Sequence, residues 1–440
     1  MPRPDRQRAL PNEVRLPLLV YNVFFPLLLL GFLPGYLLKM FRRGNYRRDF
    51  GQRFGRYSKN FRERIQHRDR IWIHAVSVGE VLIALKLIAK LRELQSGRLF
   101  ILSTTTTTAF SLAKKSEDGS LFVIYNPLDF PLCIRNALNV LRPSQIVLVE
   151  AEVWPNLTSQ AAHRGISVSL VNARLSPRSE KRFRAFRFFT GPFFRLLDLV
   201  CVQEAGDVER WVSLGIDPAR IERTGSIKFD EPTPNSARFR EFAAILQLLG
   251  TSADAPILLA GSTHPGEEKI LLSFLRELRT QFPTLLLVVA PRHVERTAEI
   301  EAIAASHDLK SVRRTQVASA SSADVLIIDT TGELRDWYPL ATVIFVGKSL
   351  TSTGGQNPVE AIAAGKPVIF GPHMENFDAI SKLLLFHKAA VQVQTGAELK
   401  GQIQQLLANP ARRDELIRNS TAALTLHAGA TARTAQLLNR

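Results

Sequence analysis

Cysteine is scarce in this chain, where Cys133 and Cys201 are the only two among 440 residues. Both stand in apolar surroundings, and two cysteines cannot supply the disulfide framework of a small secreted protein or a cysteine-based metal cluster. We therefore expect two reduced thiols in the core of a protein that stays in a reducing, cytosolic compartment.

Three signatures of nucleotide-handling enzymes are absent as well. The P-loop consensus does not occur, which disfavours an NTPase, and the spaced glycines of dinucleotide-binding proteins do not follow the first strand. No Asp-x-Asp occurs, so the usual metal-binding signature of a diphosphate-sugar transferase is missing. We expect no metal ion and no resident cofactor.

Positive charge, by contrast, is in excess and is concentrated at the N-terminal end. The formal net charge is +17, and residues 1–70 contain 16 Lys and Arg but only 5 Asp and Glu. Such an end suits nucleic acid and an anionic membrane surface equally well.

A long uncharged run at the same end favours the membrane over nucleic acid. The 23 residues from Leu16 to Leu38 carry no charge, and roughly 20 apolar residues suffice to cross a bilayer. Three prolines make the run a poor straight helix, so a kinked span, a half-inserted segment and a buried core helix all remain open. The denser basic cluster follows the run, which favours a cytoplasmic body. We expect residues 1–40 to form a membrane anchor.

From residue 71 onward, short apolar strands alternate with helical segments. The series pauses around residues 228–239, where prolines and polar residues indicate a linker, and then restarts. This alternation predicts an α/β protein of two doubly wound, Rossmann-like domains, at residues 41–230 and 231–440. Ligands of such sheets bind beyond the carboxyl ends of the strands, and we expect the active site in a cleft between the domains.

Five loops at strand ends in the second half are rich in small, hydroxyl-bearing and basic residues, as an anionic nucleotide requires. The last of them runs from Gly354 into a helix that Asn357 is expected to cap, with Pro358 at its first position. Free N–H groups there would suit a phosphate, and Glu360 would suit ribose hydroxyls. The alternative is a well-capped helix such as any α/β protein contains.

Carboxylates follow two strands of the first half. Glu80 opens a helix after Gly79, where the helix N-terminus favours the anion, and Glu150 and Glu152 follow the strand at 145–149. Two acidic loops at one sheet edge suggest a general base and stabilisation of positive charge. The alternative for Glu80 is an ordinary first-turn glutamate. Lys228, near the predicted hinge, either reaches the cleft or is a solvated lysine.

A basic and aromatic segment occupies residues 174–195. It contains seven Lys and Arg and six Phe against one acidic residue. Such a segment could bind a membrane surface or a phosphorylated lipid, or it could be a helix with an aromatic core face and a solvated basic face.

Seven motifs carry a resemblance to a known family: SVGE at 77–80, EAEVWPN at 150–156, NARLS at 172–176, GSIKFD at 225–230, PRH at 291–293, GEL at 332–334 and NPVE at 357–360. The chain resembles the bacterial 3-deoxy-D-manno-octulosonic acid (Kdo) transferases of lipopolysaccharide biosynthesis, from its apolar N-terminus to its last helix. The resemblance implies the GT-B architecture and an inverting, metal-independent glycosyltransferase. It implies transfer of Kdo from CMP-Kdo to a lipid A precursor, a phosphorylated and acylated glucosamine disaccharide, at the cytoplasmic face of the inner membrane.

The resemblance also implies roles for individual residues. Glu80 is the expected proton acceptor, and Glu150 and Lys228 are expected to stabilise the transition state. Expected CMP contacts are Pro291, Arg292, Thr331, Gly332, Glu333, Asn357, Pro358, Val359 and Glu360. Additional donor contacts are expected at Ser262, Thr263, His264 and Ser349, and acceptor or membrane contacts at Arg174, Arg178 and Arg182. The C-terminal helix is expected to pack back on the first domain.

Two positions depart from the family pattern. Lys348 stands where a second glycine is common, and Gln356 replaces a common histidine. Lys348 either adds a phosphate contact or points to solvent. The alternatives for the whole chain are another GT-B enzyme of envelope synthesis, such as a heptosyltransferase, and a non-catalytic, membrane-anchored nucleotide-binding module.

Overall fold

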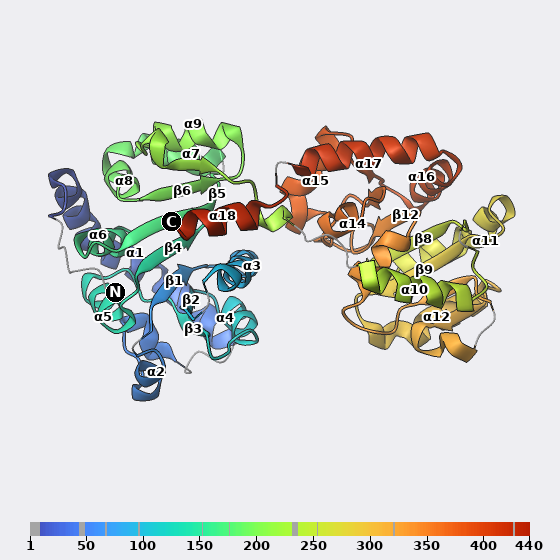
Figure 1. Cartoon of the computed structure of the whole chain (residues 1–440), viewed down its shortest axis with the longest axis horizontal. Helices are drawn as coiled ribbons and strands as arrows, with labels where there is room; N and C mark the ends of the chain where they lie inside the picture. The colour runs from blue at the N-terminus through green and yellow to red at the C-terminus, as the bar shows by residue number, and fades with distance from the viewer. Residues whose placement is uncertain are drawn as a thin grey trace. The chain divides into compact units, whose positions relative to one another are not determined.

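The chain forms two compact units, shown in Figure 1. The computed structural model describes residues 9–43, 49–66, 68–95, 97–151, 153–175, 177–230, 236–252, 254–319, 322–425 and 427–440. Unit 1 comprises residues 1–230 and 426–440, and unit 2 comprises residues 231–425. Each unit is built on a seven-stranded parallel sheet, so the prediction of two doubly wound α/β domains is confirmed. The predicted linker falls partly on residues 231–235, outside the described residues.

The sheet of unit 1 has the strand order β3-β2-β1-β4-β5-β6-β7. Its strands are β1 (Arg70–His74), β2 (Leu99–Thr104), β3 (Leu121–Tyr125), β4 (Gln145–Val149), β5 (Ser167–Ala173), β6 (Leu199–Val202) and β7 (Ile221–Arg223). The first five are almost wholly buried because helices cover both faces, which explains their continuous apolar sequence. Trp72 points to one core cluster, while its neighbours Ile71 and Ile73 point to the other. The strand order reverses between β1 and β4, where ligands of such sheets bind.

Ten helices of unit 1 lie within the described residues. They are α1 (Asn12–Arg43), α2 (Lys59–Arg64), α3 (Val78–Leu94), α4 (Thr107–Lys114), α5 (Pro131–Leu141), α6 (Pro155–His163), α7 (Pro177–Ala185), α8 (Arg187–Phe194), α9 (Ala205–Ser213) and α18 (Ala430–Leu438). The C-terminal helix α18 packs against α3, and the Asp230 carboxylate accepts hydrogen bonds from the N–H groups of Gly429 and Thr431. Cys133 and Cys201 are free and buried, as expected.

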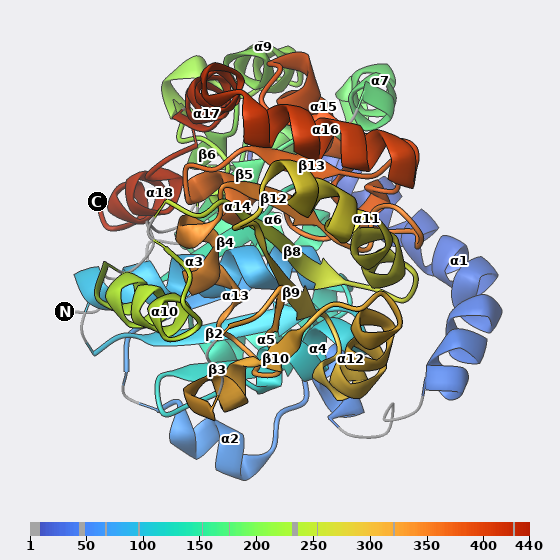
Figure 2. The same ribbon diagram turned by 90° about the vertical axis from the view of Figure 1, so that its right-hand side faces the viewer.

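Unit 2 repeats the plan with the order β10-β11-β9-β8-β12-β13-β14, which reverses between β8 and β12. Its strands are β8 (Ile257–Thr263), β9 (Leu286–Pro291), β10 (Ser311–Arg313), β11 (Val325–Ile327), β12 (Val343–Val346), β13 (Val368–Phe370) and β14 (Val391–Gln392). The helices are α10 (Ser236–Leu248), α11 (Glu267–Gln281), α12 (Thr297–Ser306), α13 (Leu334–Trp337), α14 (Val359–Ala363), α15 (Asp378–Phe386), α16 (Gly396–Ala408) and α17 (Pro410–Thr425). Figure 2 shows α11 beside α12 and α16, which together bury one face of the sheet.

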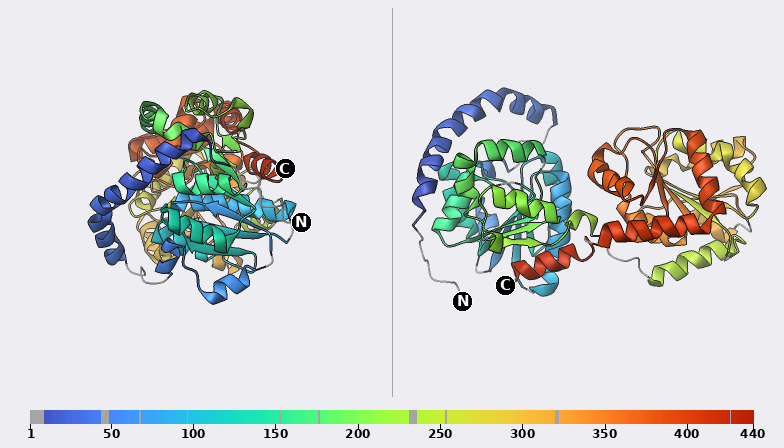
Figure 3. Two further views of the ribbon diagram at one scale, coloured as in Figure 1. Left: turned by 90° about the vertical axis from the view of Figure 1, so that its left-hand side faces the viewer. Right: turned by 90° about the horizontal axis from the view of Figure 1, so that it is seen from above.

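The uncharged N-terminal run forms a single helix, α1, despite its prolines. Figure 3 shows that this helix curves around unit 1, so the prolines bend it without ending it. One side of its first half packs on the body, where Val14 is buried and Phe25 contacts Phe130. The other side exposes more than half of each of five large apolar side chains, Leu16, Leu19, Val23, Phe24 and Leu27.

The expectation that residues 1–40 anchor the protein in a membrane is not supported by the structure. Across the residues that the structure describes, no helix combines the length and the hydropathy that a membrane span requires.

A buried polar cluster ties α1 to the start of α6. The Asp129 carboxylate accepts the N–H groups of Asn156 and Leu157, both at 2.9 Å, and so satisfies the first turn of α6. The Asn156 amide donates to the Asp129 carbonyl at 2.6 Å and to Oδ1 of Asn22 on α1 at 2.7 Å. Burial raises the pKa of Asp129 to about 6. Because α6 begins just after Glu150, this cluster supports the loop that carries that residue.

We expect Asp129→Ala to destabilise unit 1 by about 2–3 kcal/mol, because two buried N–H groups lose their acceptor. Hydrogen exchange of the α6 amides during urea unfolding measures the effect. Glu209→Ala, an exposed change on α9, is the control. Equal protection of α6 in the two variants would contradict this role of Asp129.

Candidate active site

Glu80 is held in place at the carboxyl end of β1 by the start of α3. Ser77 is the N-cap residue, and its hydroxyl oxygen accepts the Glu80 N–H at 3.3 Å. The Glu80 carboxylate in turn accepts the Ser77 hydroxyl at 2.7 Å and the Val76 N–H at 2.8 Å. Only 8% of Glu80 is exposed. These reciprocal bonds fix the orientation of the carboxylate while each of its oxygens keeps further acceptor capacity.

Glu150 lies at the end of β4, the neighbour of β1 at the reversal of strand order. Its backbone is left-handed, with φ of 65°, and its N–H donates to the Val171 carbonyl at 2.9 Å. Burial raises the pKa of the Glu150 carboxyl and the charge of Glu80 raises it further, whereas Lys228 and Arg174 lower it. The structure therefore brings the predicted Glu80, Glu150 and Lys228 together at one edge of the sheet, with Arg174 beside them. Glu152 lies outside the described residues.

The sequence did not indicate the two residues that hold the loop before Lys228. Asn172, buried at the end of β5 with φ of 53°, accepts the Ile227 N–H at 2.9 Å and the Ser226 hydroxyl at 3.3 Å. Nδ1 of His427, just before α18, accepts the Ser226 N–H at 3.1 Å. Asn172 belongs to the NARLS motif, and an asparagine at a strand end was the available signal, since asparagine tolerates the left-handed region.

The basic and aromatic segment forms helices that bury only part of their aromatic residues. Phe194 is buried against Trp211, as in a core-facing helix, whereas Phe186 and Phe188 are 62% and 82% exposed. Arg174 and Arg182 are exposed, and for Arg178 only the backbone is described.

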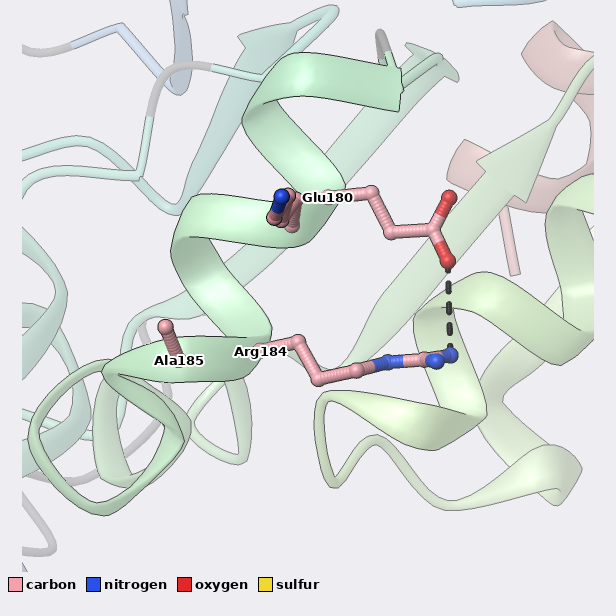
Figure 4. A pocket seen from close by; sticks show the side chains of 4 residues that line it. Glu180, Arg184 and Ala185 are labelled. Carbon is pink, nitrogen blue, oxygen red and sulfur yellow. Dashed lines mark ion pairs between the residues drawn. The ribbon is translucent and has the colours of Figure 1, made fainter.

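A cavity of about 440 Å³ lies along α7 and is lined by Glu180, Lys181, Arg184 and Ala185. Figure 4 shows Glu180 paired with Arg184, and Glu180 also pairs with Arg210, each at 3.3 Å. The acidic group of this cavity is therefore already neutralised. Neither Glu80 nor Glu150 lines it.

In unit 2, a buried carboxylate that the sequence did not reveal joins the loops after β8 and β12. Glu267 is 0% exposed and begins α11. Its two oxygens accept the N–H groups of His264, Lys348, Ser349 and Leu350 at 2.8–3.0 Å. Burial raises the pKa of Glu267, and these four bonds oppose that shift. The local sequence gives no sign of bonds to residues more than 80 positions away.

The expected donor contacts near β8 and β9 gather at those strand ends. The N–H of Arg292, directly after Pro291, donates to the Thr263 carbonyl at 3.0 Å, and the Arg292 side chain is exposed. Ser262 has φ of 55°, and Thr263 is fully buried. The Thr263 hydroxyl and Nε2 of His264 are buried without a hydrogen-bond partner among the described residues.

Ser349 lies inside the protein. Its hydroxyl donates to the Val346 carbonyl at 2.5 Å and accepts the Gly371 N–H at 2.8 Å, and its exposure is 0%. Its hydroxyl joins the ends of β12 and β13 instead of facing a ligand.

The Asn357–Glu360 motif folds differently from the prediction. Helix α14 begins at Val359, one residue later than expected, and has only five residues. Oδ1 of Asn357 accepts the Val359 N–H at 3.1 Å, and Nδ2 of Asn357 donates to the Glu360 carboxylate at 3.3 Å. The N-cap position belongs to Pro358 and not to the predicted Asn357, and the Asn357 side chain, one residue earlier, occupies the Val359 N–H that a phosphate would need.

The loop at 330–333 also has internal partners. The Thr330 hydroxyl donates to the Glu333 carboxylate at 2.7 Å, whereas Thr331 and Gly332 are exposed.

Among the described residues, no group of three or more His, Cys, Asp or Glu could hold a metal ion.

Comparisons with known proteins place these features in context. A family model described as 3-deoxy-D-manno-octulosonic-acid transferase (kdotransferase) matches residues 48–231. A 3-deoxy-D-manno-octulosonic acid transferase of Haemophilus influenzae is 32% identical over 395 residues, which cover 89% of this chain and 91% of the relative. Its namesake from Bordetella pertussis is 33% identical over 378 residues, covering 84% and 86%. The crystal structure of a UDP-GlcNAc 2-epimerase from Neisseria meningitidis, bound to UDP-GlcNAc, aligns with 84% of this chain and 100% of the epimerase chain. The identity is 14% and the TM-score is 0.51, so this similarity shows the fold alone.

We expect Glu80→Gln to lower the pKa of Glu150, because removal of a neighbouring negative charge makes ionisation easier. Lys228→Met should raise that pKa by removing a positive charge. Carboxyl ¹³C NMR titration of glutamate-labelled protein measures both shifts, with the exposed Glu93→Gln as control. An unchanged Glu150 titration in both variants would show that these groups lie far apart.

We expect Glu267→Gln to destabilise unit 2 by about 3 kcal/mol, because the amide nitrogen cannot accept the N–H groups that one carboxylate oxygen accepts. Urea unfolding followed by hydrogen exchange in unit 2 measures this change, and residues 348–350 should lose protection first. Glu415→Gln, on the exposed side of α17, is the control. Full protection of residues 348–350 in Glu267→Gln would be inconsistent with this role.

Proposed function

Because the chain belongs to the 3-deoxy-D-manno-octulosonic acid transferases, we propose that it transfers Kdo from CMP-Kdo to a lipid A precursor. It is a glycosyltransferase of lipopolysaccharide biosynthesis. The observation that carries the proposal is the meeting of Glu80, Glu150 and Lys228 at the strand-order reversal of unit 1. Two carboxylates and a cation at such a point suit proton removal and charge stabilisation.

In the proposed reaction, Glu80 is the general base. Its carboxylate, oriented by Val76 and Ser77, takes the proton from a primary hydroxyl of the acceptor glucosamine. The hydroxyl oxygen attacks the anomeric carbon of Kdo, and the bond from that carbon to the phosphate of CMP breaks. A single displacement on the face opposite CMP inverts the anomeric centre.

The other residues stabilise the charges that develop. Glu150 faces the positive, oxocarbenium-like character of the sugar, and Lys228 offsets the charge of the departing phosphate. In unit 2, Pro291 and Arg292, the 331–333 loop and the 357–360 motif are the proposed CMP contacts, with Thr263 and His264 beside them. Ser349 is not among them because its hydroxyl is used internally.

We also propose that the protein works on the anionic, cytoplasmic surface of the inner membrane. Two observations support this location: the exposed apolar side of α1, and the exposed Phe186 and Phe188 among the arginines of α7 and α8. A helix with one docked side and one exposed apolar side suits a position within the lipid interface.

Glu80→Gln should reduce Kdo transfer by about 10²–10⁴-fold, because the general base is lost, while CMP affinity stays near the wild-type value. Mass spectrometry of the lipid product and calorimetric titration with CMP measure the two quantities. Glu93→Gln, near the other end of α3, is the matched control. Turnover near the wild-type rate in Glu80→Gln would overturn the base assignment.

A further inference from the structure

We infer that the Lys348 ammonium contacts an anionic group of the nucleotide-sugar donor. This inference rests on the proposed function, which supplies the donor. It concerns a residue outside the expected CMP contacts, at the carboxyl end of β12.

The backbone of Lys348 lies in the left-handed region, with φ of 55°. A residue with a side chain is strained there, and glycine is not. Hydrogen bonds to the N–H and to the carbonyl of Lys348 hold its backbone in this conformation. The Lys348 N–H donates to Glu267 at 2.8 Å, and the Lys348 carbonyl accepts the Gly355 N–H at 3.0 Å. A lysine at a position that favours glycine indicates a use for its side chain.

The ammonium lies at the glycine turn that begins the Gly354–Glu360 loop. Nζ is 3.5 Å from the point that a Cβ on Gly354 would occupy. Gly354 and Gly355 have φ of 110° and 67°, so both need glycine, and Asn376 and Met374 fill the space that their side chains would occupy. The charge of Lys348 also reaches His264, whose pKa is lowered first by burial and then by Lys348. The ammonium therefore lies near loops that follow two neighbouring strands, β8 and β12, where contacts with the nucleotide-sugar donor are expected.

No hydrogen-bond or ion-pair partner occupies this ammonium among the described residues. Glu375, at the same glycine turn, already has partners, because its carboxylate accepts the Gly354 N–H at 2.5 Å and pairs with His373 at 3.3 Å. The Thr263 hydroxyl and Nε2 of His264 are buried and unpartnered at the neighbouring strand end. A half-buried cation without a partner is electrostatically suited to an anion.

Several backbone N–H groups near Lys348 already donate hydrogen bonds within the protein. Glu267 accepts four N–H groups of the β8 and β12 loops, and Asn357 accepts the Val359 N–H. The positive charge that balances a donor anion must therefore come from side chains, and Lys348 lies between the two loops. The donor offers two anionic groups, the phosphate that joins it to CMP and the carboxylate of its sugar acid, and an ammonium binds either as a point charge.

The test titrates the full-length protein with cytidine, CMP and inorganic phosphate, and measures KM for CMP-Kdo. Lys348→Met removes the charge and keeps the strained backbone, whereas Lys348→Gly removes both. Lys269→Met, an exposed change on α11, is the control. We expect CMP to bind about ten-fold more weakly to Lys348→Met and Lys348→Gly, with cytidine unaffected. Lys348→Gly should unfold at a higher temperature than Lys348→Met, because glycine relieves the strain.

The results distinguish a contact with the phosphate from a contact with the sugar carboxylate. They also distinguish failure of the Lys348 inference from failure of the proposed Kdo transfer. Weaker binding of CMP and inorganic phosphate assigns Lys348 to the phosphate, whereas a raised KM for CMP-Kdo with unchanged CMP affinity assigns it to the sugar carboxylate. Wild-type values for CMP affinity and KM in Lys348→Met overturn the inference, as does an equal loss for cytidine. A wild-type protein that binds CMP but transfers no Kdo refutes the proposed function, and the Lys348 comparison with CMP still stands.

Discussion

The chemistry proposed for this chain depends on the reversal of strand order at the centre of each parallel sheet. At β1 and β4 in unit 1, and at β8 and β12 in unit 2, neighbouring strands send their chains to opposite sides. Ligands of such sheets bind beyond these carboxyl ends, and the loops there carry the side chains proposed to act. The rest of each unit is apolar packing that holds these ends in register, with strands buried on both faces.

First-turn glutamates at corresponding helices have different partners in the two units. A glutamate stands in the first turn of the helix that follows the central strand: Glu80 after β1 and Glu267 after β8. Glu267 accepts four backbone N–H groups and is fully buried, so its carboxylate joins the loops after β8 and β12. Glu80 accepts one N–H and one hydroxyl and keeps a small exposed area, so it retains capacity for a proton or a substrate. The number of internal hydrogen-bond donors thus distinguishes the carboxylate that joins two loops from the one proposed to act as the base.

Much of this arrangement follows from the sequence. Alternating strands and helices predict parallel sheets, and parallel sheets bring Glu80 and Glu150 to one edge, because both follow strands directly. The partners of Glu267, the support of the Lys228 loop by Asn172 and the buried hydroxyl of Ser349 could not be predicted, because each is a tertiary hydrogen bond between distant residues. Local propensity was misleading at α14, which has too few residues to act as the expected phosphate-binding helix. The prolines of α1, in contrast, correctly predicted that it would not be a straight helix.

The transfer proposed for this chain is tested most directly by the product of the wild-type protein. The purified chain would be incubated with CMP-Kdo and lipid A precursor, and the lipid would be weighed by mass spectrometry. We expect its mass to rise by a whole number of Kdo residues, with one CMP released for each. Consumption of CMP-Kdo without any gain in the mass of the lipid would contradict the proposed transfer.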